Sequence, residues 1–246
     1  MTVSTSRDPS RIAGMFDAIA PRYDRLNHLL SAGLDRRWRR LGIQALHLSG
    51  RERVLDICTG TGDLAIEAVS EKRGRDESRP RFSGDVIGVD FAGEMLHRAL
   101  DKVRRAGLAS RIRLARGDAM QLPLPDASVD AAMVAFGIRN VVDPPAALRE
   151  MARVLRPGGR LLILEFGFPK IPGIRAAYKA YFRHVLPRVG RAVSKHGEAY
   201  SYLPASVADF ASDAAVIRMI EAAGYTDVTA VSMTLGIVYR YVGTKR

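Results

Sequence analysis

The most informative segment of the chain reads Val54-Leu55-Asp56-Ile57-Cys58-Thr59-Gly60-Thr61-Gly62-Asp63-Leu64-Ala65. Its pattern predicts a short apolar strand containing an acid, a turn through two glycines, and the start of a helix. Glycine has no Cβ, so it adopts unusual φ angles and lets the backbone come close to a ligand. Such a corner is typical of α/β proteins that bind nucleotide-like ligands, although an ordinary strand-to-helix connection has the same outline.

Charge separates the two ligand classes that use this kind of turn. A dinucleotide would place its pyrophosphate at the helix N-terminus, where Asp56 and Asp63 would repel it. S-adenosylmethionine carries no phosphate, and carboxylates attract its ammonium and sulfonium groups. The spacing Gly60-x-Gly62-x-x-Ala65 also fits a dinucleotide site, so the acids rather than the glycines favour S-adenosylmethionine.

The rest of the chain repeats the strand-helix alternation. Residues 12–48 read as helices interrupted at Pro21, and the charged segment 71–85 reads as a loop. Five strands alternate with helices, which predicts a doubly wound parallel sheet. A helix over 206–223 and a closing hairpin then bring the sheet to seven strands. The expected strands are 53–57, 86–90, 112–115, 129–136, 160–166, 226–233 and 237–243.

Composition limits the classes of protein that fit. The chain has 246 residues, 47% of them hydrophobic, and no apolar run near the roughly 18 residues that span a bilayer. The polar residues 1–11 do not resemble a secretory signal, and the single cysteine, Cys58, fits a reducing compartment. We therefore expect a cytoplasmic protein. The five histidines lack metal-ligand spacing, so no metal site is predicted.

Acids follow the next two strands as well. Asp90 ends the second strand, where its two oxygens can accept both hydroxyls of a ribose. Asp118 and Ala119 follow the third strand, where a carboxylate and the next N–H can meet an adenine ring. Ligands of doubly wound sheets lie beyond the carboxyl ends of the strands. Asp118 alone would read as a turn residue, but together with Asp56, Gly60 and Asp90 it predicts a cofactor site.

Three further segments resemble one family. Residues 23–38, the segment 136–143 that begins Phe-Gly-Ile-Arg-Asn, and residues 153–165 with Pro-Gly-Gly resemble the ubiquinone/menaquinone biosynthesis C-methyltransferases. The likeness runs from about Phe16 to the C-terminus. It implies a class I S-adenosylmethionine-dependent methyltransferase of Rossmann-like fold. It also implies an N-terminal helical cap over residues 1–48 and a methyltransferase domain over 49–246, with a helical lid inserted at about 168–203.

The resemblance also implies a reaction. A methyl group would pass from S-adenosylmethionine to a ring carbon of a polyprenylated quinol, leaving S-adenosylhomocysteine. The quinol would be demethylmenaquinol or 2-methoxy-6-polyprenyl-1,4-benzoquinol. By likeness Thr61 joins the predicted cofactor residues, which are Asp56, Gly60, Thr61, Gly62, Asp90, Asp118 and Ala119. The chain departs from the family pattern at Ala135, where a serine can stand, and at Asp35, where a histidine is frequent.

Arg139, Asn140 and Tyr23 are the expected catalytic residues. Arg139 and Asn140 follow the fourth strand, where Arg139 can stabilise a quinolate oxygen and Asn140 can orient a hydroxyl. Tyr23 can donate a hydrogen bond from the N-terminal helices. The alternative interpretation pairs Arg139 with Asp143 on the surface and packs Tyr23 within the cap. His196 is a second candidate for a base.

The net charge of +12 favours an anionic partner. From residue 170 to 196 the chain has seven basic residues and no acidic one, interleaved with apolar residues. This pattern predicts a lid that contacts an anionic membrane surface on the inner face of the membrane, with a solvated helix face as the alternative. A nucleic-acid methyltransferase and a noncatalytic quinone-binding protein remain rival functions. Ala146 of Asp143-Pro144-Pro145-Ala146 cannot stack on a base, so we expect no nucleic-acid partner; a homodimer stays open.

Overall fold

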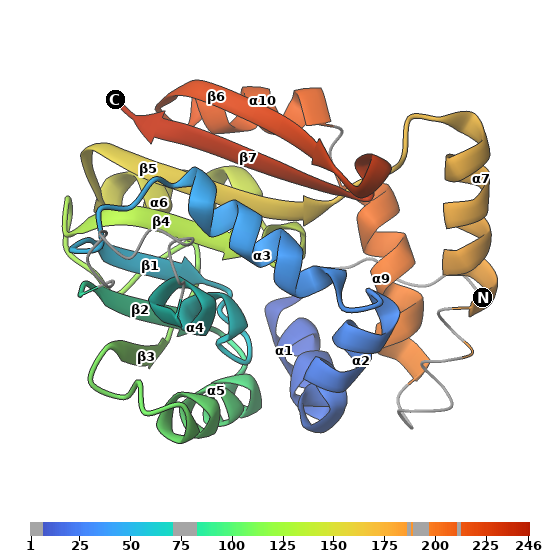
Figure 1. Ribbon diagram of the computed structural model, residues 1–246, viewed down its shortest axis with the longest axis horizontal. Coiled ribbons are helices and arrows are strands. Elements are labelled where there is room, and N and C mark those ends of the chain that lie inside the picture. Colours follow the sequence, from blue (N-terminus) through green and yellow to red (C-terminus); the bar gives the residue numbers. More distant parts are fainter. Residues whose placement is uncertain (1–6, 71–82, 186–187, 189–196, 211–212) are drawn as a thin grey trace.

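A single seven-stranded sheet forms the centre of the protein, seen in a computed structural model that describes residues 7–70, 83–185, 188, 197–210 and 213–246 (Figure 1). The strand order is β3-β2-β1-β4-β5-β7-β6. All neighbouring pairs are parallel except those made by β7, which lies antiparallel between β5 and β6. The predicted doubly wound, mostly parallel sheet is therefore confirmed. The strands are β1 (Arg53–Ile57), β2 (Asp85–Asp90), β3 (Ile112–Arg116), β4 (Val129–Ala135), β5 (Leu155–Phe166), β6 (Tyr225–Met233) and β7 (Val238–Lys245).

Helices cover both faces of the sheet because its strands are apolar on both sides. In β5, Leu161 and Ile163 belong to one core cluster, whereas Leu162 and Leu164 belong to the other. The first cluster is completed by α6 (Pro144–Val154) and α10 (Asp213–Ala222). The second is completed by α3 (Leu34–Ala45), α4 (Asp63–Ser70) and α5 (Gly93–Arg105).

Two predicted boundaries were wrong. The sequence predicted one helix over 206–223, but α9 (Gly197–Asp209) and α10 are separate helices. The two helices lie in different places. Helix α9 lies beyond the carboxyl ends of the strands, whereas α10 covers a face of the sheet, so one straight helix could not occupy both positions. Strand β5 begins at Leu155 rather than at Arg160. Its residues 156–159 form a bulge, since Leu155 pairs with Val129 and Arg160 with Ala131.

Further helices gather beyond the carboxyl ends of the parallel strands (Figure 1). Tyr181 hydroxyl donates to the carbonyl of Leu30 at 3.0 Å, which joins the second half of the chain to the N-terminal helices. The Glu94 N–H donates to Asp17 at 2.9 Å and fixes α1 to the start of α5. The helices at this end of the sheet are α1 (Pro9–Ile19), η1 (Ala20–Arg22), α2 (Tyr23–Leu30), η2 (Ile138–Asn140), α7 (Pro172–Ala180), the π-helix η3 (Tyr181–Val185), α9, and η4 (Thr234–Gly236).

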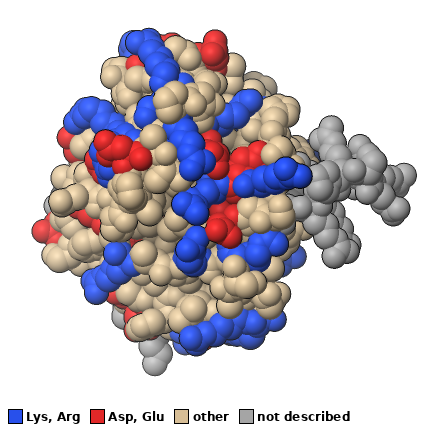
Figure 2. Space-filling view, turned by 90° about the vertical axis from the view of Figure 1, so that its left-hand side faces the viewer, with Lys and Arg blue, Asp and Glu red and all other residues tan. Residues whose placement is uncertain are grey.

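The opposite end of the molecule carries charges of both signs. Figure 2 shows basic and acidic side chains interleaved on that face. Arg153 pairs with Asp126 at 2.6 Å, and Arg156 pairs with Asp130. Most of the loop predicted over 71–85 lies outside the described residues. No helix among the described segments is long and apolar enough to cross a lipid bilayer.

Candidate active site

The glycine turn has the backbone that its sequence requires. Gly60 and Gly62 have φ values of 55° and 81°, in the region that favours glycine. A Cβ at Gly62 would stand 3.2 Å from the Cβ of Ala99, so this glycine also allows α4 to pack against α5. The turn therefore needs glycine at both positions. Gly62 contacts the neighbouring helix α5 and does not line a cavity.

Asp56 lies beneath this turn and is buried. Its carboxyl group accepts a hydrogen bond from the Thr59 hydroxyl at 2.6 Å. Burial disfavours the charged form and raises the pKa of Asp56 to about 7. Asp56 does not line the cavities described below, so its side chain supports the turn from behind.

Thr61 is bonded to the N-terminal helices. Its hydroxyl donates to Asp24 of α2 at 2.6 Å. Lys102 of α5 donates to the other oxygen of Asp24 at 2.8 Å and also contacts Asp63. This cluster ties α2 to the glycine turn, and Thr61, like Gly62, lies outside both cavities.

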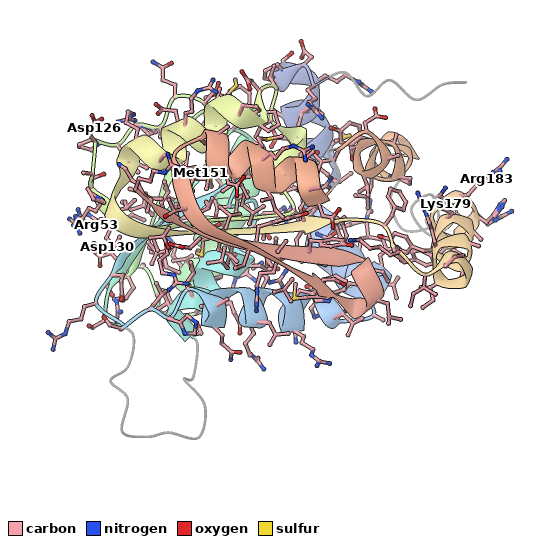
Figure 3. All side chains as sticks on the ribbon, turned by 90° about the horizontal axis from the view of Figure 1, so that it is seen from above. Arg53, Asp126, Asp130, Met151, Lys179 and Arg183 are labelled. Atoms are coloured by element: carbon pink, nitrogen blue, oxygen red, sulfur yellow. The ribbon has the colours of Figure 1, made fainter. Side chains whose placement is uncertain are left out.

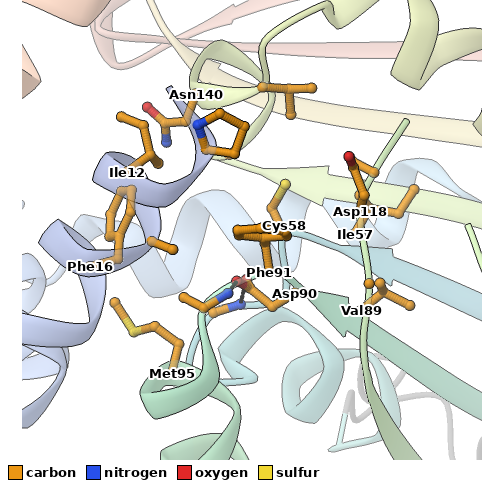
Figure 4. A pocket seen from close by; sticks show the side chains of 18 of the residues that line it. Ile12, Phe16, Ile57, Cys58, Val89, Asp90, Phe91, Met95, Asp118 and Asn140 are labelled. Carbon is orange, nitrogen blue, oxygen red and sulfur yellow. Dashed lines mark hydrogen bonds between the residues drawn. The ribbon is translucent and has the colours of Figure 1, made fainter. Parts of the chain in front are cut away.

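The first cavity lies at the carboxyl ends of β1, β2 and β4, and Gly60, Asp90, Asp118 and Ala119 all line it (Figure 4). Asp90 accepts hydrogen bonds from the Gly60 N–H at 2.7 Å and from the Ala92 N–H at 2.9 Å, one on each oxygen. Each oxygen keeps a second acceptor site. Burial raises the pKa of Asp90, and these two N–H groups oppose the rise.

The walls of this cavity are mostly apolar. Asp118 accepts from the Met120 N–H at 2.8 Å, which fixes its carboxylate at the rim. Cys58 also lines the cavity, and burial raises the pKa of its thiol well above the usual value, so it is a neutral side chain. Apolar lining residues come from α1, α5 and the segments that follow β2 and β4: Ile12, Phe16, Phe91, Met95 and Val142. The donor set fits S-adenosylmethionine, since the Asp90 oxygens can accept from a ribose diol and the apolar walls suit an adenine.

A second, larger cavity adjoins the first. The two share the lining residues Phe16, Tyr23 and Phe136. Sequence reasoning missed this cavity because its walls come from helices and turns far apart in the chain. It is rich in aromatic side chains, with Trp38, Phe166, Tyr178, Tyr181 and Tyr202 in addition to the shared rings. Its polar lining residues are Asn27, Ser31, Asp35, Arg39 and Arg139.

Arg139 is buried in the wall of the second cavity and pairs with Glu165 at 2.8 Å. Its guanidinium also contacts the carbonyl of Phe136 and lies 5.5 Å from the centre of the Phe166 ring. The surface pair with Asp143 is wrong, because Asp143 instead caps α6 by accepting from the Ala146 N–H.

Glu165 is a residue that sequence reasoning did not single out. It ends the apolar run of β5 as a single acid and is 1% exposed. A single acid at the end of an apolar strand was the sequence signal that could have identified Glu165 as a site residue. Burial raises the pKa of Glu165, and the charge of Arg139 opposes the rise.

Asn140 and Tyr23 occupy the junction of the cavities. Asn140 lines the first cavity, and its amide oxygen accepts from the Tyr202 hydroxyl at 3.2 Å. Tyr23 lines both, and burial raises its pKa, so its hydroxyl stays protonated and can donate. His196 lies outside the described residues. The structure therefore brings the three predicted catalytic residues together around the two cavities.

Comparison with known proteins shows the family. The profile of the ubiE/COQ5 methyltransferase family matches residues 2–245. The chain belongs to this family. It is 44% identical over 240 residues to the ubiquinone/menaquinone biosynthesis C-methyltransferase UbiE of Geobacter sp. (strain M21), with 98% of each chain covered. It is also 44% identical to the demethylmenaquinone methyltransferase of Deinococcus radiodurans, over 94% of this chain and 91% of that one.

Solved structures agree on the fold of this ubiE/COQ5 family member. A SAM-dependent methyltransferase from Aquifex aeolicus superposes with a TM-score of 0.61 at 19% identity, over 91% of this chain and 98% of that chain. The [4+2]-cyclase SpnF reaches 0.65 at 18% identity, over 95% and 94% of the two chains. A cyclase and a methyltransferase share the architecture, so the fold alone does not give the reaction. Together with the family, these findings confirm an S-adenosylmethionine-dependent methyltransferase.

Proposed function

We propose that the chain transfers a methyl group from S-adenosylmethionine to a ring carbon of a polyprenylated quinol, converting demethylmenaquinol to menaquinol. The benzoquinol 2-methoxy-6-polyprenyl-1,4-benzoquinol is a second substrate of the same class. One observation carries the proposal: a larger cavity rich in aromatic side chains adjoins the proposed cofactor cavity and shares Phe16, Tyr23 and Phe136 with it. The names of the relatives from Geobacter and Deinococcus support the same substrate class.

The residues of the first cavity would hold the cofactor, which supplies an electrophilic methyl group when bound. Asp90 would accept from the ribose hydroxyls with the acceptor sites that its backbone partners leave free. Asp118 and the Ala119 N–H would recognise the adenine. Asp56, Thr61 and Gly62 would act indirectly, by holding the turn at Gly60 in place.

The residues of the second cavity would prepare the quinol ring. Arg139 would stabilise the negative charge that develops on the quinol oxygen, because a fixed cation in a water-poor site acts strongly on nearby charge. Tyr23 would donate to the same or the opposite oxygen, and Asn140 would orient the ring. The aromatic walls would exclude water and hold the ring beside the methyl group.

We propose a division into cap and catalytic domain that differs from the expected boundary at residue 48. Helices α1 and α2 supply Phe16, Tyr23 and Asn27 to the cavities, so we propose that they form the cap proper. Helix α3 shares the second core cluster with the sheet through Trp38 and Ile43, and belongs with the catalytic domain.

A membrane surface is the proposed docking partner of the outer lid face, defined as Leu29, Ile171, Arg175, Lys179, Arg183, Val185 and Leu235. These side chains are exposed. Figure 3 shows Lys179 and Arg183 pointing away from the body of the protein, at the end opposite Arg53 and Asp130. The second cavity is lined by their neighbours Leu30, Tyr178 and Tyr181, so a polyprenyl tail leaving it would meet the apolar part of this face.

Labelled cofactor tests the reaction. Purified protein with methyl-labelled S-adenosylmethionine and demethylmenaquinol in detergent is expected to place the label in the quinol extract. Asp90→Ala should lose affinity for S-adenosylhomocysteine, whereas Arg139→Ala should bind it normally and lose turnover. Label that enters RNA but never a quinol would favour the nucleic-acid rival. Binding of S-adenosylmethionine without turnover on either quinol would favour the noncatalytic one.

Vesicle flotation tests the docking face. Arg183→Glu should weaken binding to vesicles containing phosphatidylserine by about thirtyfold, since each charge near an anionic surface contributes about 1 kcal/mol and the substitution changes the charge by two units. Arg53→Glu makes the same change at the opposite end and is the matched control. Equal binding by both variants would remove the outer lid face from membrane contact.

A further inference from the structure

Methylation of a quinol ring carbon releases one proton in each turnover. The hydroxyl gives up its proton, the ring carbon forms the new C–C bond, and the S–C electron pair neutralises the sulfonium. The hydrogen of the attacked carbon then replaces the hydroxyl hydrogen as the ring regains aromaticity. One proton must therefore leave the second cavity in each turnover.

Few groups in the second cavity can take that proton. Burial raises the pKa values of Tyr23, Tyr178 and Tyr202, so these hydroxyls hold their protons at neutral pH. Arg39 and Arg139 are fixed cations and are not bases. Among the described residues that line this cavity, Asp35 is the one carboxylate. The proton therefore has one anionic acceptor on the cavity wall.

Asp35 is joined to a histidine that reaches solvent. The Nδ1 atom of His28 lies 3.0 Å from Oδ1 and 3.1 Å from Oδ2 of Asp35. His28 does not line the cavity, and 34% of its side-chain surface is exposed, against 7% for Asp35. The pair thus connects the inside of the cavity with the outside of the protein across one hydrogen bond.

We infer that Asp35 and His28 form the proton exit of the substrate cavity, so that His28 is a positioning and proton-transfer partner of the reaction. The inference rests on the proposed quinol methylation. The quinol proton passes to Asp35 and from there to Nδ1 of the neutral imidazole, in the tautomer that carries its hydrogen on Nε2. The Nε2 hydrogen then leaves to solvent, and tautomer exchange through water resets the ring. Imidazole suits this step because it binds and releases protons near neutral pH.

The groups around Asp35 favour its deprotonated form, so the carboxylate can accept a proton but does not retain it. Burial opposes its charge, but Arg39, Ser31 and His28 outweigh burial and hold the pKa of Asp35 below the usual range. Ser31 donates to Oδ1 at 2.9 Å, and Arg39 donates to Oδ2 at 2.7 Å. A proton that reaches such a carboxylate moves on readily to the imidazole.

The charges of neighbouring elements complete this setting. Asp63 of α4 pairs with Arg39 at 3.2 Å and also with Lys102 of α5, so this carboxylate lies between two cations. Arg139 of η2 lines the same cavity and favours the deprotonated quinol. The pH profile of kcat is therefore a readout of the Asp35–His28 pair.

The test compares His28→Asn and His28→Ala with the control His97→Asn. His97 lies on α5 with 75% of its side chain exposed and contacts Glu94. Asparagine can keep the hydrogen bond to Asp35 but cannot carry a proton. With demethylmenaquinol as substrate, His28→Asn should lower kcat by about 100-fold or more, the lower end for general acid–base groups, with KM and S-adenosylhomocysteine affinity within twofold. The control should match the wild type.

Two readouts separate proton transfer from mere support of the fold. Added imidazole should restore part of the kcat of His28→Ala, and the acid limb of the pH profile should vanish in His28→Asn. Unchanged kcat in His28→Asn, or a persistent acid limb without imidazole rescue, would overturn the inference while quinol methylation stands. Wild-type protein that binds S-adenosylhomocysteine but methylates no quinol would overturn the proposed function first.

Discussion

Asp56 should make the stability of this protein fall as pH rises. Burial raises the pKa of this carboxyl to about 7 in the folded protein, against about 3.9 in an unfolded chain. Because the folded value is the higher one, the contribution is fully present below about pH 4 and is lost as pH rises through 7. Between these two pKa values the loss amounts to about 4 kcal/mol, and about 2 to 3 kcal/mol of it falls between pH 5 and pH 8.

The substitution Asp56→Asn isolates the contribution of this carboxyl group to the pH dependence of stability. The amide resembles the protonated carboxyl in shape, and its oxygen can still accept from the Thr59 hydroxyl. Urea unfolding of wild type and variant at several pH values gives the difference in free energy of unfolding, in which other titrating groups cancel. The free energy of unfolding of Asp56→Asn, relative to that of the wild type, should increase by about 2 to 3 kcal/mol from pH 5 to pH 8.

Asp101→Asn on α5 is the matched control, because it makes the same substitution at an exposed side chain. If the Asp56→Asn difference does not change with pH, Asp56 is charged throughout, and the reasoning from its burial fails. S-adenosylhomocysteine should still bind to Asp56→Asn, because this side chain does not line the cofactor cavity.

Three further outcomes follow from buried or capping contacts. Glu165→Leu should lower the free energy of unfolding by about 3 kcal/mol, because it leaves Arg139 charged and without its carboxylate partner. The double variant Arg139→Met/Glu165→Leu should recover most of this loss. A double variant as unstable as Glu165→Leu would contradict this explanation. Met151→Ala should cost about 3 kcal/mol, since the side chain is fully buried. Asp143→Ala should cost about 1 kcal/mol by removing the cap on Ala146, measured in the same urea titrations.

The core of the fold was readable from local patterns. The glycine turn and most of the apolar strands lie where the sequence predicted, because a strand buried on both faces is an unbroken apolar run and glycine adopts a positive φ most readily. Asp90, Asp118 and Ala119 could be placed at one edge for the same reason, since parallel strands end at a common edge. The family was also identifiable from short motifs in residues 23–38, 136–143 and 153–165.

Tertiary structure decided what these residues touch. Asp56 and Thr61 belong to the same motif as Gly60, yet the packing of α2 and the burial of β1 turn both away from the cavity. The Arg139–Glu165 pair joins η2 to the end of β5, and the Asp35–His28 pair joins α2 to α3, so both depend on how these elements pack. Motifs fix the chemistry available to a chain, whereas desolvation and partner distance, which set charge and reactivity, exist only once the chain has packed.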